Sequence, residues 1–202
     1  MFDVVEYTKF RIDSNFQMLP LTIEDDKIYF DGQLVQDSDM KYPFGDGFIN
    51  IGYNFKNSIS RVLSNLYHME FVFRGKYVKS IEGVLQGIKY QDIDTQNLVL
   101  NYSGIDAYHT RACNEMDFWG NEGILYWQGT PMARDGEEYQ LFLDELYISA
   151  LTNPLYQRAL LSTQDNYLLH HIGKDNINET VLTRYEFESR LNTLREFLRE
   201  KI

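Results

Sequence analysis

The chain has 202 residues, of which 44% are hydrophobic and 15% aromatic, and its formal net charge at pH 7 is −11. This composition is typical of a globular protein with a sizeable core, in one large domain or two small ones. The negative charge opposes indiscriminate binding to DNA or RNA, although a local basic patch could still hold a nucleic-acid substrate. No apolar run approaches the roughly 20 residues that cross a bilayer, and the first residues lack the apolar centre of a signal peptide.

Cysteine and histidine usage points to a reducing setting and to chemistry without a metal. Cys113 is the only cysteine, so no internal disulfide can form, and we expect a cytoplasmic protein without membrane association. The four histidines lack zinc-site spacing, and the chain has no P-loop and no Gly-x-Gly-x-x-Gly motif. We therefore expect no metal and no cofactor.

Residues 1–47 are predicted to form a β-rich N-terminal extension. Residues 28–30 and 33–35 are β-prone and flank Asp31-Gly32, which is a strong signal for a two-residue hairpin turn. The last six residues of the extension include one proline and two glycines and mark a boundary. Their composition is not that of a linker, so we expect the extension to pack on a main domain of residues 48–202.

The middle of the chain is predicted to be mainly extended up to residue 79. A strand is expected at residues 67–73, which are rich in aromatic and β-branched side chains, and Gly75 marks a turn after it. Residues 94–130 are irregular, with short β-like pieces at 98–100 and 124–127.

The C-terminal third is predicted to be helical. Apolar residues recur at helical spacing from Tyr139 to Ala150, and Asn153-Pro154 is typical of the start of a second helix. A capping box at residues 183–186 precedes an apolar stripe that ends at Leu198. With strands early and helices late, we expect the α+β class: a single mainly helical domain with a small β component, besides the N-terminal extension.

The stretch SIEGVLQGIKYQD, residues 80–92, is predicted to be a helix with Ser80 as its N-cap. It retains Gly83 and Gly87, although glycine costs a helix about 1 kcal/mol relative to alanine. A helical wheel separates an apolar arc from a narrow polar arc of Glu82, Gln86 and Lys89, with the glycines beside the polar arc. A solvated polar face would explain this spacing, while the glycines favour close contact with a ligand or a neighbouring backbone.

Residues 64–90, SNLYHMEFVFRGKYVKSIEGVLQGIKY, resemble the NADAR superfamily, whose domains are associated with NAD and ADP-ribose metabolism. The family begins with a Ser-Asn-aromatic-aromatic motif, here Ser64-Asn65-Leu66-Tyr67. It continues into a helix written Glu-His-Tyr-x-Gln-x-x-Lys-aromatic, which is matched here by Glu82, Gln86, Lys89 and Tyr90. Gly83 and Val84 replace its usual histidine and aromatic residue.

A looser match follows in the second half, so that the resemblance covers about residues 48–200 and leaves the extension without a counterpart. The family's Leu-Leu-x-Thr and Leu-x-x-His segments, with a following Asp, correspond to Leu160, Leu161, Thr163, Leu168, His171 and Asp175. Two features depart from the pattern: Ser149-Ala150 replaces Lys-Phe, and no Trp-Gly follows Asp175.

The resemblance implies a metal-independent hydrolase that cleaves an N-glycosidic bond to a ribose. We expect it to remove ADP-ribose from guanine bases of nucleic acid. Two alternatives stay open: an N-glycosidase of phosphorylated riboflavin-pathway intermediates, and a module that binds ADP-ribose without cleaving it. Such a bond breaks through an oxocarbenium-like sugar, which requires a carboxylate beside C1′.

Glu82 is expected to be this carboxylate, because the helix macrodipole favours its ionised form in the first turn. Asp175 is a candidate second carboxylate, although an aspartate in GKDN is also typical of a turn. Lys89 could keep Glu82 charged or contact a phosphate, and it could equally be solvated. Asn65 could bind ribose hydroxyls or cap a turn.

Further candidate substrate contacts have structural alternatives of their own. Trp127, with Trp119 as a second choice, could stack on the base or belong to the core. A basic run of Arg74, Lys76 and Lys79 could hold a pyrophosphate or nucleic-acid backbone, or protect an exposed strand edge. His171 could be a structural histidine or a general acid. Tyr67 and Gln86 complete the predicted substrate-binding set.

Overall fold

The structure is a computed structural model that describes residues 47–110 and 123–201 in full. Ahead of residue 47 it also describes the backbone of four short strands. These strands are β1 (Leu21–Glu24), β2 (Lys27–Phe30), β3 (Gln33–Leu34) and β4 (Phe44–Gly45). Cys113 and Trp119 lie outside the described residues.

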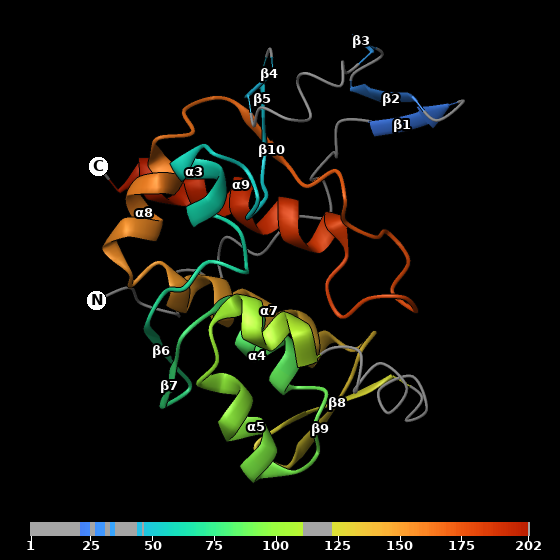
Figure 1. The fold of residues 1–202 in the computed structure, drawn as a ribbon, viewed down its shortest axis with the longest axis vertical. Helices are drawn as coiled ribbons and strands as arrows, with labels where there is room; N and C mark the ends of the chain where they lie inside the picture. The colour runs from blue at the N-terminus through green and yellow to red at the C-terminus, as the bar shows by residue number, and fades with distance from the viewer. Residues whose placement is uncertain are drawn as a thin grey trace.

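The strands β1, β2 and β3 form a small antiparallel sheet, drawn in blue at one edge of the molecule in Figure 1. β2 ends at Phe30, β3 begins at Gln33, and these two residues pair with each other. The hairpin predicted around Asp31-Gly32 is therefore confirmed.

A second sheet joins segments that are far apart in the sequence. Its central strand is β5 (Phe48–Asn50), which pairs antiparallel with β4 and parallel with β10 (Tyr167–Leu169). Phe48 lies opposite Tyr167, so the C-terminal half of the chain returns to the start of the main domain. The pairing of β4 with β5 spans residue 47, where the boundary of the extension was placed.

The residues that the structure describes form two further hairpins. β6 (Phe71–Phe73) pairs with β7 (Lys76–Val78), and β8 (Ile124–Trp127) pairs with β9 (Thr130–Ala133). Each turn has two residues with positive φ, Arg74-Gly75 (44° and 76°) and Gln128-Gly129 (48° and 83°), as tight hairpin turns require. The strand predicted at residues 67–73 begins only at Phe71, whereas the piece at residues 124–127 is confirmed.

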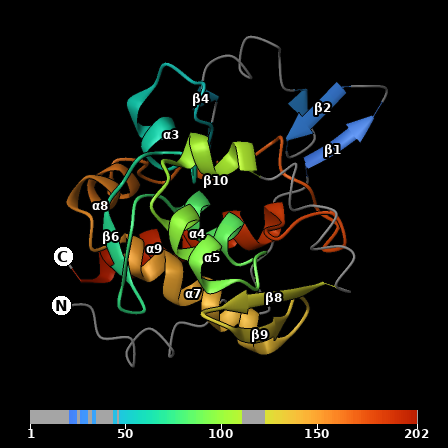
Figure 2. The same cartoon turned by 60° about the horizontal axis from the view of Figure 1, so that its bottom comes forward.

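The helices form most of the body of the molecule. They include α3 (Ser58–Val62), α4 (Ile81–Gly87), α5 (Ile93–Leu100), α7 (Glu137–Ala150), α8 (Pro154–Leu161) and α9 (Arg184–Glu200), and residues 104–110 are helical as well. Figure 2 shows α4 and α5 side by side, with α7 and α9 next to them. The apolar faces of α4, α7 and α9 meet in one hydrophobic core, which also takes side chains from β6 and β8.

The three C-terminal helices are confirmed together with the caps that predicted them. Asn153 Oδ1 accepts hydrogen bonds from the backbone N–H groups of Leu155 and Tyr156, and Pro154 occupies the first turn. Thr183 and Glu186 form a reciprocal capping box at the start of α9. The predicted α+β class is confirmed as well.

Two segments that were expected to be extended are helical. Residues 98–100 belong to α5, which begins where the Asp92 carboxylate accepts a hydrogen bond from Thr95 N. Residues 58–62 form α3, which Asn57 caps. In both cases a side-chain cap and burial of one face outweigh the strand preference of the β-branched residues.

Candidate active site

A cleft of about 490 Å³ lies where α4 faces the loop that leads into α9. Its other walls come from residues 51–55, which follow β5, and from residues 64–66, which precede β6. Among the side chains that line this cleft are five of the predicted site residues: Asn65, Glu82, Gln86, Lys89 and His171. Four of the five come from the region of the NADAR-like motif, so the structure brings that motif together in one concave site.

The polar arc of α4 is buried at the cleft rather than solvated. Ser80 caps the helix through a 2.9 Å hydrogen bond from Gly83 N, as predicted. Glu82 lies in the first turn and is only 9% exposed, and Gln86 Nε2 donates a 2.7 Å hydrogen bond to its Oε1. Because the carboxyl oxygen accepts this hydrogen bond, the contact fixes the orientation of the Gln86 amide.

Gly83 and Gly87 do not line the cleft, so the interpretation in which they contact a ligand is not supported. A Cβ atom at Gly83 would lie 3.1 Å from Ser80 Oγ and 3.2 Å from Val99 O, and one at Gly87 would lie 3.4 Å from Leu100 Cδ2. The glycines therefore allow α5 to approach α4 closely. A ligand cannot lie against them in this arrangement, because α5 already occupies that side.

Gln96 on α5 secures this close approach. Its Nε2 donates hydrogen bonds to Gly87 O (3.1 Å) and Tyr126 O (2.8 Å), while its Oε1 accepts from Gln128 N and Nε2 (both 2.8 Å). The side chain is 1% exposed. One buried amide thus joins the end of α4, helix α5 and the hairpin of β8 and β9.

Asn65 is positioned by two contacts that the sequence did not reveal. Its backbone carbonyl accepts a 3.0 Å hydrogen bond from Glu82 N, and its Oδ1 accepts a 2.9 Å hydrogen bond from the hydroxyl of Tyr147 on α7. Burial raises the pKa of Tyr147 well above its ordinary value, so this hydroxyl remains a donor. The Asn65 amide nitrogen is then left to donate to a ligand in the cleft.

Two adjacent histidines line the cleft with complementary ring nitrogens. His170 Nδ1 lies 2.8 Å from Ile51 O and must therefore donate, which leaves its Nε2 as an acceptor. His171 Nδ1 lies 2.7 Å from Asn50 Nδ2, while Asn50 Oδ1 accepts a 3.3 Å hydrogen bond from His171 N. Asn50 therefore offers its amide donor to His171, whose Nδ1 accepts and whose Nε2 carries the proton.

Both histidines are neutral at physiological pH. Burial, with a smaller effect from His170, lowers the pKa of His171 to about 4, and burial also lowers the pKa of His170. Glu188 on α9 fixes the backbone at the histidines, because its Oε1 accepts a 2.7 Å hydrogen bond from His170 N. A neutral His171 with a protonated Nε2 can donate to a ligand, but it is a poor general acid.

Asp175 does not join Glu82 in the cleft. Its side chain is 64% exposed, its Oδ1 accepts a 3.1 Å hydrogen bond from Arg184 Nε, and it is absent from the cleft lining. The expectation of a second carboxylate beside C1′ is therefore not met by Asp175. Asp175, in the exposed GKDN segment, instead forms an ion pair with Arg184, the first residue of α9.

Trp127 belongs to the core and not to the cleft. It is 8% exposed, and its ring packs edge to face on Phe73 (5.0 Å between centroids) and Phe142 (5.4 Å). Tyr67 likewise packs against the core and does not line the cleft. Neither aromatic side chain can stack on a ligand in the cleft in this arrangement.

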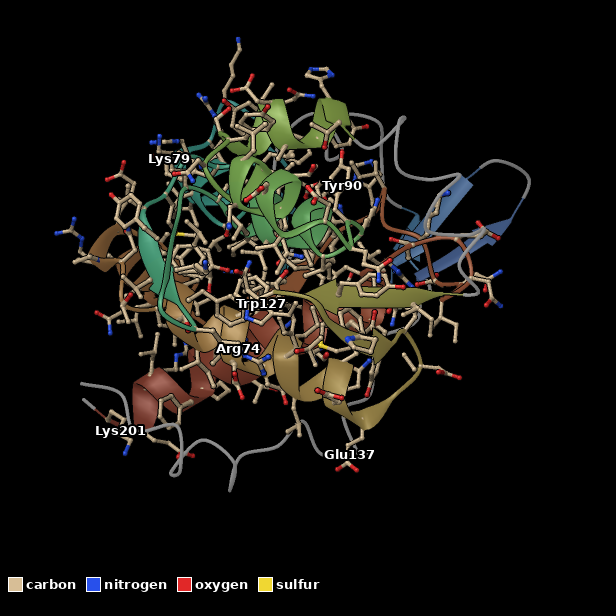
Figure 3. The ribbon with its side chains drawn as sticks, turned by 90° about the horizontal axis from the view of Figure 1, so that it is seen from below. Arg74, Lys79, Tyr90, Trp127, Glu137 and Lys201 are labelled. Atoms are coloured by element: carbon tan, nitrogen blue, oxygen red, sulfur yellow. The ribbon has the colours of Figure 1, made fainter. Side chains whose placement is uncertain are left out.

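The basic run also lies away from the cleft. Arg74 forms a 2.6 Å ion pair with Glu145 and lies over the Phe142 ring, and neither Lys76 nor Lys79 lines the cleft. Figure 3 shows Arg74 close to Trp127 and Lys79 well separated from both. The run follows the hairpin of β6 and β7, so the strand-edge interpretation fits it better than a phosphate site.

Cations that do line the cleft are Lys89, Lys174 and Arg184, of which only Lys89 was predicted. Apolar side chains such as Leu66, Leu85 and Phe187 make up another part of the wall. Among the residues that the structure describes, no group of three or more His, Cys, Asp or Glu side chains could hold a metal ion. No helix within the same residues is long and apolar enough to cross a membrane.

Comparison with known proteins finds a matching protein family and a similar protein, both described from phages. The family described as Bacteriophage protein GP30.3 matches residues 57–196, a range that includes α4, His171 and Arg184. A protein of Enterobacteria phage T4, described as an uncharacterized 17.1 kDa protein in the Gp30-rIII intergenic region, is 30% identical over 141 residues. That alignment covers 69% of this chain and 91% of the T4 protein, and no solved structure matches. The chain therefore belongs to the bacteriophage GP30.3 protein family.

Proposed function

We propose that the cleft hydrolyses the N-glycosidic bond of an ADP-ribose-type riboside, with ADP-ribosylated guanine in nucleic acid as the favoured substrate. The observation that carries this proposal is the position of Glu82, Gln86 and Asn65. These residues of the NADAR-like motif come from two segments and line one cleft. Glu82 and Gln86 are buried there, whereas the polar face of an ordinary amphipathic helix would be solvated.

Glu82 is the group that performs the chemistry in this proposal. As the C1′–N bond breaks, its electron pair leaves with the base, and positive charge develops on the ribose ring. The Glu82 carboxylate stabilises this charge and accepts a proton from the water whose oxygen bonds to C1′. Gln86 keeps the carboxylate oriented through the 2.7 Å hydrogen bond, and Asn65 and His171 offer donors to the ribose hydroxyls or the base.

The direct test is release of free ADP-ribose from a DNA oligonucleotide that carries ADP-ribosylated guanine. The wild-type protein should release it, and Glu82→Gln should reduce the rate at least about a hundredfold, the lower range for loss of a general base. Glu145→Gln is the matched control, because Glu145 lies on α7 in the ion pair with Arg74 and outside the cleft. No release by the wild type, or equal rates for wild type and Glu82→Gln, would refute the proposal.

A phosphorylated riboside of the riboflavin pathway is the alternative substrate for the same chemistry. Val84 stands where the family has an aromatic residue, and it is buried in the core and does not line the cleft, so this position supplies no aromatic wall for a base. Steady-state kinetics with ADP-ribosylated guanine DNA and with the phosphorylated riboside compare the two substrate classes directly. A higher kcat/KM for the riboside would move the assignment to that substrate class.

The position of Asp175 favours a second candidate function, a module that binds ADP-ribose without cleaving it. A glycosidase usually has two acidic groups at the reacting centre, whereas Asp175 is 64% exposed at an ion pair outside this cleft. Calorimetry with ADP-ribosylated oligonucleotide, followed by analysis of the same sample for cleavage, separates the two functions. Tight binding with intact substrate after prolonged incubation would favour the module.

A further inference from the structure

Arg184, the first residue of α9, presents an unused guanidinium edge to the cleft. Its side chain is only 8% exposed and lines the cleft. Its Nε donates to Asp175 Oδ1 at 3.1 Å and lies 4.0 Å from Glu188 Oε1. Within residues 47–110 and 123–201, neither Nη1 nor Nη2 donates a hydrogen bond, so four of the five N–H donors of this arginine are unused.

The fold brings a second cation to the same position. Arg184 N donates a 2.8 Å hydrogen bond to Lys174 O, which ties the loop after β10 to the start of α9. Gly173 permits this contact, because a Cβ atom there would lie 3.0 Å from Arg184 Cβ. Lys174 and Arg184 therefore lie next to each other on one wall of the cleft, although like charges repel.

The acidic groups around these two cations leave the inner edge of Arg184 available. Asp175 and Glu188 both contact its Nε side. Glu179 lies 3.9 Å from Lys174 Nζ through a contact in which both side chains are more than half exposed. Asp175 and Glu188, which do not line the cleft, thus orient Arg184 from outside, whereas Glu179 lines the cleft beside Lys174. The planar pair of Nη groups has the geometry that binds a phosphate in a bidentate manner.

We propose that Arg184 and Lys174 form an anion subsite that binds the pyrophosphate of an ADP-ribose-type ligand whose ribose lies at Glu82. The identity of the ligand rests on the proposed function, whereas the anion subsite rests on the contacts of Arg184 and its neighbour Lys174. Asp175 is then a positioning residue that holds the arginine. This assignment gives the predicted site residue a role different from that of a second carboxylate.

Isothermal titration calorimetry with ADP-ribose and with inorganic pyrophosphate tests the subsite without any cleavage step. Arg184→Gln should weaken the binding of both ligands at least about tenfold, as loss of charge-assisted hydrogen bonds implies. Arg74→Gln is the matched control, since Arg74 is an arginine outside the cleft, and it should bind as the wild type does. An Arg184→Gln protein that binds pyrophosphate as tightly as the wild type overturns the proposal, as does a wild type that binds neither ligand.

Two more variants keep the test valid if Arg184→Gln does not fold. Lys174 and Asp175 are exposed, so Lys174→Gln and Asp175→Asn should fold normally and weaken pyrophosphate binding a few-fold. Unchanged binding in both variants would overturn the subsite. An unmodified single-stranded oligonucleotide should not displace ADP-ribose, and displacement would overturn the assignment to a pyrophosphate in favour of a phosphodiester backbone.

The subsite and the glycosidase proposal can fail separately. Binding of pyrophosphate through Arg184 without any release of ADP-ribose would leave the subsite intact and refute the enzyme. Release of ADP-ribose that is unaffected by Arg184→Gln would refute the subsite and leave the enzyme intact. Glu82→Gln should retain pyrophosphate binding in either case.

Discussion

Alanine substitutions at the two glycines of α4 should have opposite effects on stability, because the two positions differ in the room that α5 leaves. At Gly83 the new Cβ would approach Val99 O to 3.2 Å and Ser80 Oγ to 3.1 Å, and a backbone carbonyl cannot move aside easily. At Gly87 the nearest atoms are side-chain carbons at 3.4 and 3.5 Å, which is ordinary van der Waals contact.

The expected magnitudes follow from these distances. Each substitution gains up to about 1 kcal/mol from helix propensity. Overpacking against a fixed neighbour costs about 1–3 kcal/mol, and this cost applies to Gly83→Ala only. We therefore expect Gly83→Ala to lower the free energy of unfolding by about 1–2 kcal/mol and Gly87→Ala to be neutral or stabilising.

Urea denaturation followed by far-UV circular dichroism measures both effects, with unchanged m-values as the check that only stability has changed. Thermal unfolding should agree, with a fall of about 2–8 °C for Gly83→Ala in a domain of this size. Equal destabilisation by both substitutions would refute the packing argument. A ligand-binding defect in a fully stable Gly87→Ala protein would revive the interpretation in which the glycines face the substrate.

Three other perturbations test the surroundings of the cleft. Arg134→Met should lower the free energy of unfolding by about 3–5 kcal/mol, because it removes a buried 2.6 Å partner from Glu186, and a loss below about 1 kcal/mol in urea denaturation would contradict this. Burial raises the pKa of Glu188 to about 7, above its unfolded value, so its contribution to stability is full at low pH and is lost as pH rises through about 7. Glu188→Gln should therefore flatten the decline in Tm between pH 5 and pH 8, and identical pH profiles for variant and wild type would exclude this role. Burial depresses the pKa of His171 to about 4, so the stability that its neutral form confers is present above pH 6.5 and is lost as pH falls through about 4. Its Cε1 proton signal in NMR should stay constant from pH 8 to pH 5, and a titration midpoint near 6.5 would show that the ring is solvated.

Local signals in the sequence predicted much of the fold correctly. The caps at Asn153 and Thr183 and the turn at Asp31-Gly32 each depend on a few neighbouring residues, and each was confirmed. The polar arc of α4 was also correct as a set, because helical spacing alone places Glu82 and Gln86 on one face. Short-range chemistry was sufficient in these cases, although the local caps at Asn57 and Asp92, which begin α3 and α5, were missed.

Long-range packing explains what the sequence did not predict. The glycines of α4 contact residues of the next helix, α5, which no local pattern around them indicates. Trp127 lies in the core because it packs against Phe73 and Phe142. The contact of Tyr147 with Asn65 crosses 82 positions of sequence, and no local pattern marks it. The position of Arg184 in the cleft was also missed, because an arginine between the two residues of a capping box is common in a sequence.

The parallel pairing of β5 with β10 has a consequence for synthesis of the chain. Asn50, near the start of the main domain, bonds to His171, and these residues are 121 positions apart. During translation the first half of the domain leaves the ribosome long before its partner strand exists, and such distant closures are slow to form. The proposed activity therefore requires translation to pass residue 184, and a product terminated before that point would carry Glu82 without the wall that faces it.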